Sequence, residues 1–279
     1  MKILFITHYY EPDSGAAAVR LTRLARLLQA RGHEVTVLTT MPHYPQGRIA
    51  DDYRGKFSTD EKRDGLRVVQ VWLWATPSNS IVKRLISQIS FMLTGTLRGL
   101  FLPRPDVIFI ENQPIFTGLA GWFLSRVKRR PYLLNVSDFW PEYLLEVGVM
   151  KETHPLYRLF RALVNLTQRG AAALVALLPG LLQSVAARIG PVKNGRVIFN
   201  AVDLQRFRPG LDASEFRRGH GLAGKRVVLF AGTFANHIDF ETTMDAAARL
   251  RHREDLRFVF AGTGIQQERI QQRLAQGAA

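Results

Sequence analysis

The sequence predicts an α/β protein built on a doubly wound parallel sheet, and two patterns along the chain support this prediction. Short apolar runs recur, and most of them are continuous stretches of Val, Ile, Leu and Phe, as expected for parallel strands that are covered on both faces. Segments with helical periodicity separate these runs. This alternation is typical of a parallel sheet with helices packed on both sides.

The expected strands fall into two groups. The first group comprises residues 2–7, 34–39, 66–74, 106–110, 132–136, 174–177 and 197–199, and the second comprises residues 226–231 and 257–261. Between the first two strands, residues 16–31 should form a helix, because Leu21, Leu24, Leu27 and Leu28 share one stripe and Gly32 suits a helix C-terminus. A polar stretch rich in Gly and Arg, residues 199–225, separates the two groups.

We therefore expect two domains, residues 1–200 and residues 201–279. The second group of strands supplies only about two strands and two helices. An open parallel sheet of two strands cannot bury both of its faces. The second domain is accordingly expected to be incomplete.

The composition excludes several classes of protein and predicts the charge of the partner. Apolar residues make up 47% of the 279 residues, too many for a disordered chain, and the absence of cysteine excludes disulfides and thiolate metal sites. The start of the chain lacks a signal-peptide pattern and no apolar run is long enough to span a bilayer, so we expect a cytoplasmic protein. The 38 Lys and Arg exceed the 23 Asp and Glu, for a formal charge of +15, which predicts a polyanionic partner. An Arg-rich coding bias is the alternative explanation of this charge.

The loop after the first strand, within HYYEPDSGAAAVRL (residues 8–21), is the first candidate site. Ligands of a doubly wound sheet bind beyond the carboxyl ends of its strands. Gly15 lets a ligand approach the main chain, and the helix that follows offers unpaired N–H groups and a dipole suited to a phosphate. The loop matches neither the GxGxxG fingerprint nor a Walker A loop. An ordinary turn at Gly15 is the alternative interpretation.

The stretch SDFWPE (residues 137–142) is the second candidate site. Asp138 follows the strand expected at residues 132–136 and should project from its carboxyl end. A carboxylate there could orient an acceptor hydroxyl, or stabilise the positive charge of an oxocarbenium-like transition state. Alternatively, Asp138 caps a helix that starts near Pro141 and Glu142.

Residues 80–102, SIVKRLISQISFMLTGTLRGLFL, form a wide apolar stripe with Lys83, Arg84 and Arg98 interspersed. An amphipathic helix with cations suits shallow attachment to an anionic membrane surface. The alternative is a helix whose apolar face packs in the core of the first domain.

Several stretches, in the expected order, resemble a GT-B glycosyltransferase of family 4, within the branch of the colanic-acid and O-antigen transferases. The resemblance begins with ITHYYEPDSGAAAVRLTRLARLLQARGHEVTVLTTMPHYPQGRIADDYRGKF. It continues through RPDVIFIENQPIFTGLAGWFLS, LLNVSDFWPEYLLEVGVM, HPLYRLFRALVNL, FNAVDLQRFRP and VVLFAGTF, and so covers nearly the whole chain.

This resemblance implies two Rossmann-like domains, the first for the acceptor and the second for a nucleotide-diphosphate sugar. Transfer in such enzymes usually retains the anomeric configuration without a metal, so no metal and no further cofactor is expected. The implied acceptor is a glycan or a sugar on undecaprenyl diphosphate, as in the biosynthesis of lipopolysaccharide and other cell-surface polysaccharides. Such an acceptor implies a peripheral position at the inner face of the plasma membrane.

The resemblance also suggests roles for single residues. Asp138 is the expected catalytic group. The loop at Asp13 would lie against the diphosphate or the transferred sugar, and Arg20 would add a cation unless it lies on a solvated helix face. The expected substrate-binding residues are Asp13, Ser14, Gly15, Arg20, His43, Tyr44 and Glu142, and the expected nucleotide-binding residues are Asn200, Gly232 and Thr233.

Three departures from the family pattern stand out. The hinge motif Asn-Gly-Val-Asp has Ala201 in place of its glycine, and the acidic Asp239 and Glu241 follow the first turn of the second domain. The donor-binding Glu-x7-Glu motif does not occur in this second domain. We therefore expect a transferase truncated within its C-terminal domain, with little turnover by this chain alone.

Two other functions are compatible with parts of the sequence. A non-catalytic, membrane-associated binding module that pairs with a separate C-terminal half is the main alternative. A nucleic-acid binder has only the charge in its favour, because the sequence lacks an RNA-recognition signature and its aromatic residues lie mostly in apolar runs. Nucleic acid is therefore not an expected partner.

Overall fold

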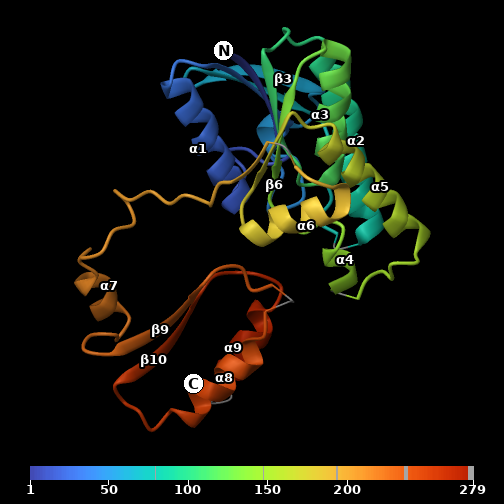
Figure 1. Ribbon diagram of the computed structural model, residues 1–279. Helices are drawn as coiled ribbons and strands as arrows, with labels where there is room; N and C mark the ends of the chain where they lie inside the picture. The colour runs from blue at the N-terminus through green and yellow to red at the C-terminus, as the bar shows by residue number, and fades with distance from the viewer. Residues whose placement is uncertain (79, 147, 193, 236–237, 276–279) are drawn as a thin grey trace. The chain divides into compact units, whose positions relative to one another are not determined.

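The computed structural model describes residues 1–78, 80–146, 148–192, 194–235 and 238–275 (Figure 1). The chain divides into two compact units, Met1–Ala201 and Val202–Ala279. Each unit has a sheet of its own.

The described strands of the first unit form an eight-stranded sheet in the order β3-β4-β2-β1-β5-β6-β7-β8. All neighbours are parallel except β3 and β4. This arrangement confirms the predicted Rossmann-like α/β fold. The strands are β1 (Lys2–Ile6), β2 (Glu34–Thr40), β3 (Ser58–Arg63), β4 (Leu66–Val71), β5 (Val107–Glu111), β6 (Tyr132–Val136), β7 (Ala173–Ala176) and β8 (Gly195–Val197).

Helices cover both faces of this sheet. The helices are α1 (Ala16–Ala30), α2 (Ile81–Leu100), α3 (Ile115–Lys128), α4 (Tyr143–Glu146), α5 (Pro155–Arg169) and α6 (Pro179–Ile189), with a short 3-10 turn, η1 (Asp51–Tyr53). The predicted first helix ends one residue earlier than expected, and Gly32 follows it with a positive φ of 82°, as a helix-terminating glycine does.

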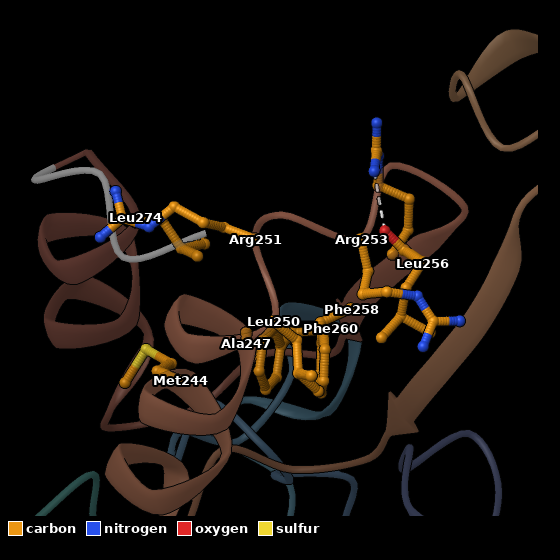
Figure 2. Close-up of a pocket in the computed structure, with 10 residues that line it drawn as sticks. Met244, Ala247, Leu250, Arg251, Arg253, Leu256, Phe258, Phe260 and Leu274 are labelled. Atoms are coloured by element: carbon orange, nitrogen blue, oxygen red, sulfur yellow. Dashed lines mark hydrogen bonds between the residues drawn. The ribbon is translucent and has the colours of Figure 1, made fainter.

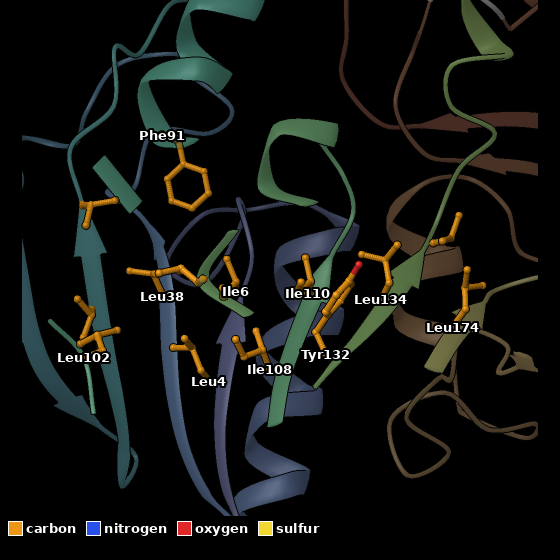
Figure 3. Packing of buried hydrophobic residues seen from close by; sticks show 14 of the residues in the cluster. Leu4, Ile6, Leu38, Phe91, Leu102, Ile108, Ile110, Tyr132, Leu134 and Leu174 are labelled. Atoms are coloured by element: carbon orange, nitrogen blue, oxygen red, sulfur yellow. The ribbon is translucent and has the colours of Figure 1, made fainter. Parts of the chain in front are cut away.

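The core is divided by the alternation of side chains along each strand. Leu4 and Ile6 of β1 face one side, where they meet Ile108, Ile110 and Phe91 (Figure 3). The intervening side chains of β1 face the other side, where they pack against α1. Because both faces of each central strand are buried, these strands read as continuous apolar runs.

The connections of the central strands define where a ligand can bind. Strand β1 pairs with β2 on one side and with β5 on the other. Helix α1 leads from β1 to β2, whereas α3 leads from β5 to β6. The carboxyl ends of β1 and β5 therefore flank the topological switch point, the usual ligand site of such a sheet.

Strand β3 was not among the predicted strands. Its sequence, STDEKR, is charged because this antiparallel strand lies at the sheet edge with much of its surface in solvent. Asp64 and Gly65 join it to β4, with φ values of 48° and 80°. An Asp-Gly pair between two strands is a strong hairpin signal, so the sequence did contain the information.

The second unit contains α7 (Ser214–Gly219), β9 (Arg226–Ala231), α8 (Phe240–Arg249), β10 (Leu256–Ala261) and α9 (Gln267–Ala275). Strands β9 and β10 are parallel. A small core of Phe234, Phe240, Met244 and Ile270 joins the helices to this sheet. Val228 and Leu229 of β9 are exposed by 45% and 59%, so part of this sheet is open to solvent.

Candidate functional site

The carboxylate of Asp13 joins the loop after β1 to the loop after β2. Asp13 is buried, and its Oδ1 accepts the main-chain N–H groups of His43 at 2.7 Å and Tyr44 at 2.8 Å. Three of the predicted substrate-binding residues therefore meet at one edge of the sheet. Asp13 itself shapes the loops with its side chain, whereas Ser14 beside it is exposed.

A pair of buried histidines lies next to Asp13. The rings of His8 and His43 meet edge to face at 5.4 Å, and the ring of Tyr9 stacks on His43. The Nδ1 of His43 is 3.0 Å from the carbonyl oxygen of Met41, a pure acceptor, so neutral His43 carries its proton on Nδ1. Burial lowers the pKa of His43, against the opposing effect of Asp13, and lowers the pKa of His8 well below its ordinary value. Both rings are therefore neutral at neutral pH.

Gly15 places the N-terminus of α1 at the same edge. Its φ of 122° and ψ of 159° belong to a region that side chains rarely adopt, and an added Cβ would lie 3.1 Å from the Tyr44 ring. No side chain caps this helix, and its first i→i−4 bond runs from the Val19 N–H to the Gly15 oxygen. The N–H groups that precede Val19 in the first turn thus have no intrahelical partner, as an anion-binding helix start requires.

The guanidinium of Arg20 points across the switch point to Glu111, at the end of β5. Its NH2 donates to Glu111 Oε2 at 3.0 Å and to Ser137 Oγ at 3.0 Å. The side chain is 22% exposed, so Arg20 is neither on a fully solvated face nor an unpaired cation. Burial raises the pKa of Glu111, and Arg20 opposes this effect.

Glu111, Asn135 and Ser137 were absent from the sequence-based candidates. Glu111 follows the apolar run of residues 107–110 at the carboxyl end of a predicted strand. A carboxylate in that position was the signal that could have identified it.

Asp138 directly follows Ser137 and is exposed at the carboxyl edge. Its charge contributes to the raised pKa of Glu111, the carboxylate that accepts from the preceding residue, Ser137. Helix α4 begins at Tyr143, five positions beyond Asp138. The main-chain oxygens of Phe139 and Pro141 accept the N–H groups of its first residues, so the side chain of Asp138 lies outside that turn.

Glu142 makes an ion pair with Arg188 of α6. The same arginine donates to the main-chain oxygen of Trp140 and to Gln168 of α5. Through Arg188, Glu142 therefore ties the SDFWPE stretch to α6 and α5, and its own side chain remains 29% exposed.

In the second unit, Gly232 and Thr233 form the exposed turn after β9. The Phe234 N–H donates to the Thr263 oxygen, and an added Cβ at Gly262 would lie 1.9 Å from the Gly232 oxygen. The turns after β9 and β10 thus pack main chain against main chain, an arrangement that only glycine permits. Asn200 is exposed in the segment that ends the first unit.

The acidic residues beyond this turn have structural partners. Asp239 caps α8 by accepting the main-chain N–H of Thr242 at 3.2 Å. Glu241 pairs with Arg269 of α9 at 2.9 Å. Asp239 thus has a capping role in α8, and Glu241 joins α8 to α9.

A hollow of about 350 Å³ lies elsewhere in the second unit (Figure 2). Leu250 and Phe260 line its apolar part, and Arg251 and Arg253 lie near its rim. Gly232 and Thr233 are not part of it. Across the described residues, no group of three or more His, Asp or Glu could hold a metal ion.

The predicted amphipathic helix is present as α2, and much of its apolar stripe is exposed to solvent. Val82, Ile86, Leu93 and Leu97 are 65%, 46%, 61% and 50% exposed, and their spacing places them on one face. The other face is buried through Phe91. None of the helices in the described part of the chain is long and apolar enough to cross a membrane.

The chain resembles known proteins along its length. A family model described as "Glycosyl transferase 4-like domain" matches residues 15–201. The chain is 24% identical over 294 residues to WcaI of Escherichia coli (strain K12), named for glycosyl transfer in colanic acid biosynthesis, and covers 68% of that protein. It is 23% identical over 278 residues to a GDP-mannose-dependent alpha-mannosyltransferase of Mycolicibacterium smegmatis, and covers 65% of it. Each alignment includes 97% of this chain.

Solved structures show the same fold. Sucrose-phosphate synthase of Thermosynechococcus elongatus matches with a TM-score of 0.70 at 17% identity, over 99% of this chain and 67% of that one. Anabaena Alr3699/HepE in complex with UDP-glucose matches with a TM-score of 0.63 at 19% identity, over 99% and 66%. The chain thus spans about two thirds of the length of these proteins.

Proposed function

The chain belongs to the glycosyl transferase 4-like family, and from this premise we propose that it serves sugar transfer from a nucleotide-diphosphate sugar to a glycan or lipid-linked acceptor. The observation that carries the proposal is the arrangement at the switch point. There, an uncapped helix N-terminus, the Gly15 turn and the exposed Asp138 lie along the same sheet edge. The nucleotide-sugar donor is supported by the family and by relatives whose names include GDP-mannose and UDP-glucose.

In this proposal, the parts of the site have separate tasks. The free N–H groups at the start of α1 hold a phosphate oxygen or the transferred sugar. Asp138 orients the acceptor hydroxyl, or stabilises the positive charge of an oxocarbenium-like centre. Gly232 and Thr233 of the second unit hold the nucleotide, and Asn200 lies in the hinge. We propose that the transfer needs no metal and retains the anomeric configuration.

The test is sugar transfer and donor hydrolysis with a panel of UDP- and GDP-sugars. The chain is assayed alone and with a homologous C-terminal segment added, and Asp138→Asn is compared with Asp51→Asn. Asp51 is a matched control because it is an exposed aspartate that pairs with Arg54. We expect Asp138→Asn to lower kcat by about 10²-fold or more and Asp51→Asn to have no effect. Equal rates for the two variants would contradict the role of Asp138.

We further propose that the acceptor is carried on a membrane and that α2 docks the protein on the inner face of the plasma membrane, as a peripheral protein. Helix α3 packs against both α2 and α5. These three helices contain no Asp or Glu, whereas each contains Lys or Arg. Helix α3 also has exposed apolar side chains, Phe123 and Val127. Apolar groups beside cations are the requirement for binding anionic lipid. A lipid-linked acceptor for cell-surface polysaccharide or lipopolysaccharide fits such a surface.

Vesicle sedimentation tests this second part. Leu97→Ser is compared with Leu178→Ser, because both side chains are 50% exposed and only Leu97 belongs to the α2 stripe. We expect binding to phosphatidylglycerol vesicles that weakens with salt and with Leu97→Ser, and that Leu178→Ser leaves unchanged. Equal binding to neutral phosphatidylcholine vesicles, or equal losses in the two variants, would contradict docking through α2.

A second candidate function is a non-catalytic membrane-bound module that pairs with a separate C-terminal half. The open face of the β9–β10 sheet, with Val228 and Leu229 exposed, favours it. Vesicle binding without any nucleotide-sugar turnover, even after addition of a C-terminal segment, would support this function over transfer.

A further inference from the structure

Glu111 and three polar side chains that donate to it form a cluster at the switch point. The Oε2 of Glu111 accepts from Arg20 at 3.0 Å and from the Asn135 amide at 2.7 Å, and its Oε1 accepts from the Ser137 hydroxyl. Glu111 is 2% exposed and Asn135 is 4% exposed. The members come from α1, β5, β6 and the residue after β6, so the cluster joins elements that are far apart in the sequence.

The hydrogen-bonding capacity of Ser137 is filled by this cluster. A hydroxyl has one proton to donate and two lone pairs that accept. Ser137 donates to Glu111 and accepts from Arg20 at 3.0 Å and from Asn135 at 3.2 Å. A buried network whose members are all satisfied is rigid and specifies one arrangement.

The cluster lies between the two parts of the proposed site. Arg20 belongs to α1, close behind the free N–H groups of its first turn, and Ser137 is bonded in sequence to Asp138. Arg20 and Ser137 touch each other and share Glu111. The position of Asp138 relative to the helix start is therefore determined through these side chains.

We infer that Glu111 is a positioning residue, which holds the N-terminus of α1 and Asp138 at a fixed separation by joining Arg20 to Ser137. This inference rests on the proposed function, because the value of that separation lies in aligning the donor with the acceptor. Misplacement of reacting groups by about 1 Å lowers turnover by about 10²-fold. Glu111 does not touch the substrate in this role.

Amide hydrogen exchange on the whole chain tests the cluster without any turnover. Glu111→Gln keeps the size of the side chain but replaces one carboxylate oxygen with an NH2 group. That group is a donor, and it would face the donors of Arg20, Asn135 or Ser137. Ser137→Ala removes the hydroxyl, whereas Ser137→Thr keeps it on a partly exposed residue. Asp60→Asn is the matched control, because Asp60 is also a carboxylate bound by arginine, here by Arg67 and Arg98, but it lies at the β3 edge.

We expect Glu111→Gln and Ser137→Ala to accelerate exchange by about tenfold in peptides from residues 16–24 and 137–146 together. Ser137→Thr and Asp60→Asn should exchange like the wild-type chain, as should the strands β1 and β2 in every variant. Unchanged exchange in Glu111→Gln would overturn the inference. An equal acceleration throughout the sheet would also overturn it, because it would show general destabilisation.

The transfer assay then separates positioning from binding. For Glu111→Gln, we expect kcat to fall by about 10²-fold while the donor KM changes by less than about threefold. A rise in KM at unchanged kcat would overturn the positioning role. If the wild-type chain with an added C-terminal segment transfers no sugar, the proposed function fails, and the exchange experiment still decides whether the cluster fixes the two segments.

Discussion

Replacing Gly15 with alanine should destabilise the first unit, because two separate features of the structure require glycine there. The backbone has φ 122° and ψ 159°, and the new Cβ would lie 3.1 Å from Cε1 of the Tyr44 ring. Tyr44 is 43% exposed, so its ring can move and the contact is the smaller of the two costs. The backbone conformation is the larger cost, because nearly all residues that adopt it are glycine.

The backbone conformation sets the expected loss of stability, because it is the larger of the two costs. A side chain held in that backbone region costs about 1–3 kcal/mol. A change of about 2 kcal/mol lowers Tm by about 4–8 °C in a unit of this size. Gly32→Ala is the matched control, because Gly32 also has a positive φ, 82°, but no atom lies within 4 Å of its added Cβ. It should lose only about 1 kcal/mol, the cost of left-handed backbone.

Thermal unfolding followed by tryptophan fluorescence measures these losses. All four tryptophans lie in the first unit, so the signal reports the unit that contains Gly15. The double variant Gly15→Ala, Tyr44→Ala should lose less than the sum of the single changes, since the contact with the ring is absent. A Tm for Gly15→Ala equal to that of the wild type or of Gly32→Ala would refute the backbone argument.

The remaining predictions concern pH and the second unit. Burial lowers the folded-state pKa of His8 and His43 below 6.5, the value that applies in the unfolded chain. As the pH falls, the unfolded state therefore binds protons first. The stabilising contribution of the two neutral rings should be complete above about pH 7, and the free energy of unfolding should fall as the pH drops below about 6.5. His8→Phe should flatten the dependence of Tm on pH between about 7.5 and 5.5, and an unchanged slope would show that His8 does not titrate on unfolding. Asp239→Ala removes the cap of α8 and should destabilise the second unit by about 1 kcal/mol. Urea unfolding should show this loss by circular dichroism, with the tryptophan midpoint unchanged; equal shifts in both signals would contradict independent unfolding of the units.

The sequence predicts the parallel strands well because burial on both faces makes them continuous apolar runs. The same reasoning fails at β3, which is exposed at the sheet edge and charged. It also places the last strand of the first unit too late, because β8 ends at Val197 and the exposed Ile198 and Phe199 lie beyond it. Apolar character predicts burial only where packing follows, and near the boundary of the unit it does not.

The location of the site was predictable, whereas the tasks of its side chains were not. Strand ends of a parallel sheet meet at one edge, so the loops at Asp13, His43 and Asp138 could be grouped from the sequence. That Asp13 turns inward to bind main-chain N–H groups depends on the fold of two loops. The pairing of Arg20 with Glu111 joins residues 91 positions apart, and no local pattern encodes such a pair.

The β9–β10 sheet has a consequence for handling the protein at high concentration. Within the described residues these strands pair only with each other, so each leaves one row of main-chain donors and acceptors open. Their sequences, RVVLFA and LRFVFA, are almost entirely apolar, a composition that favours strand addition between molecules. In the larger sheet, the edge strand β3 carries charged side chains, which disfavour such strand addition. Any strand addition between copies of this 279-residue chain should therefore involve β9 and β10.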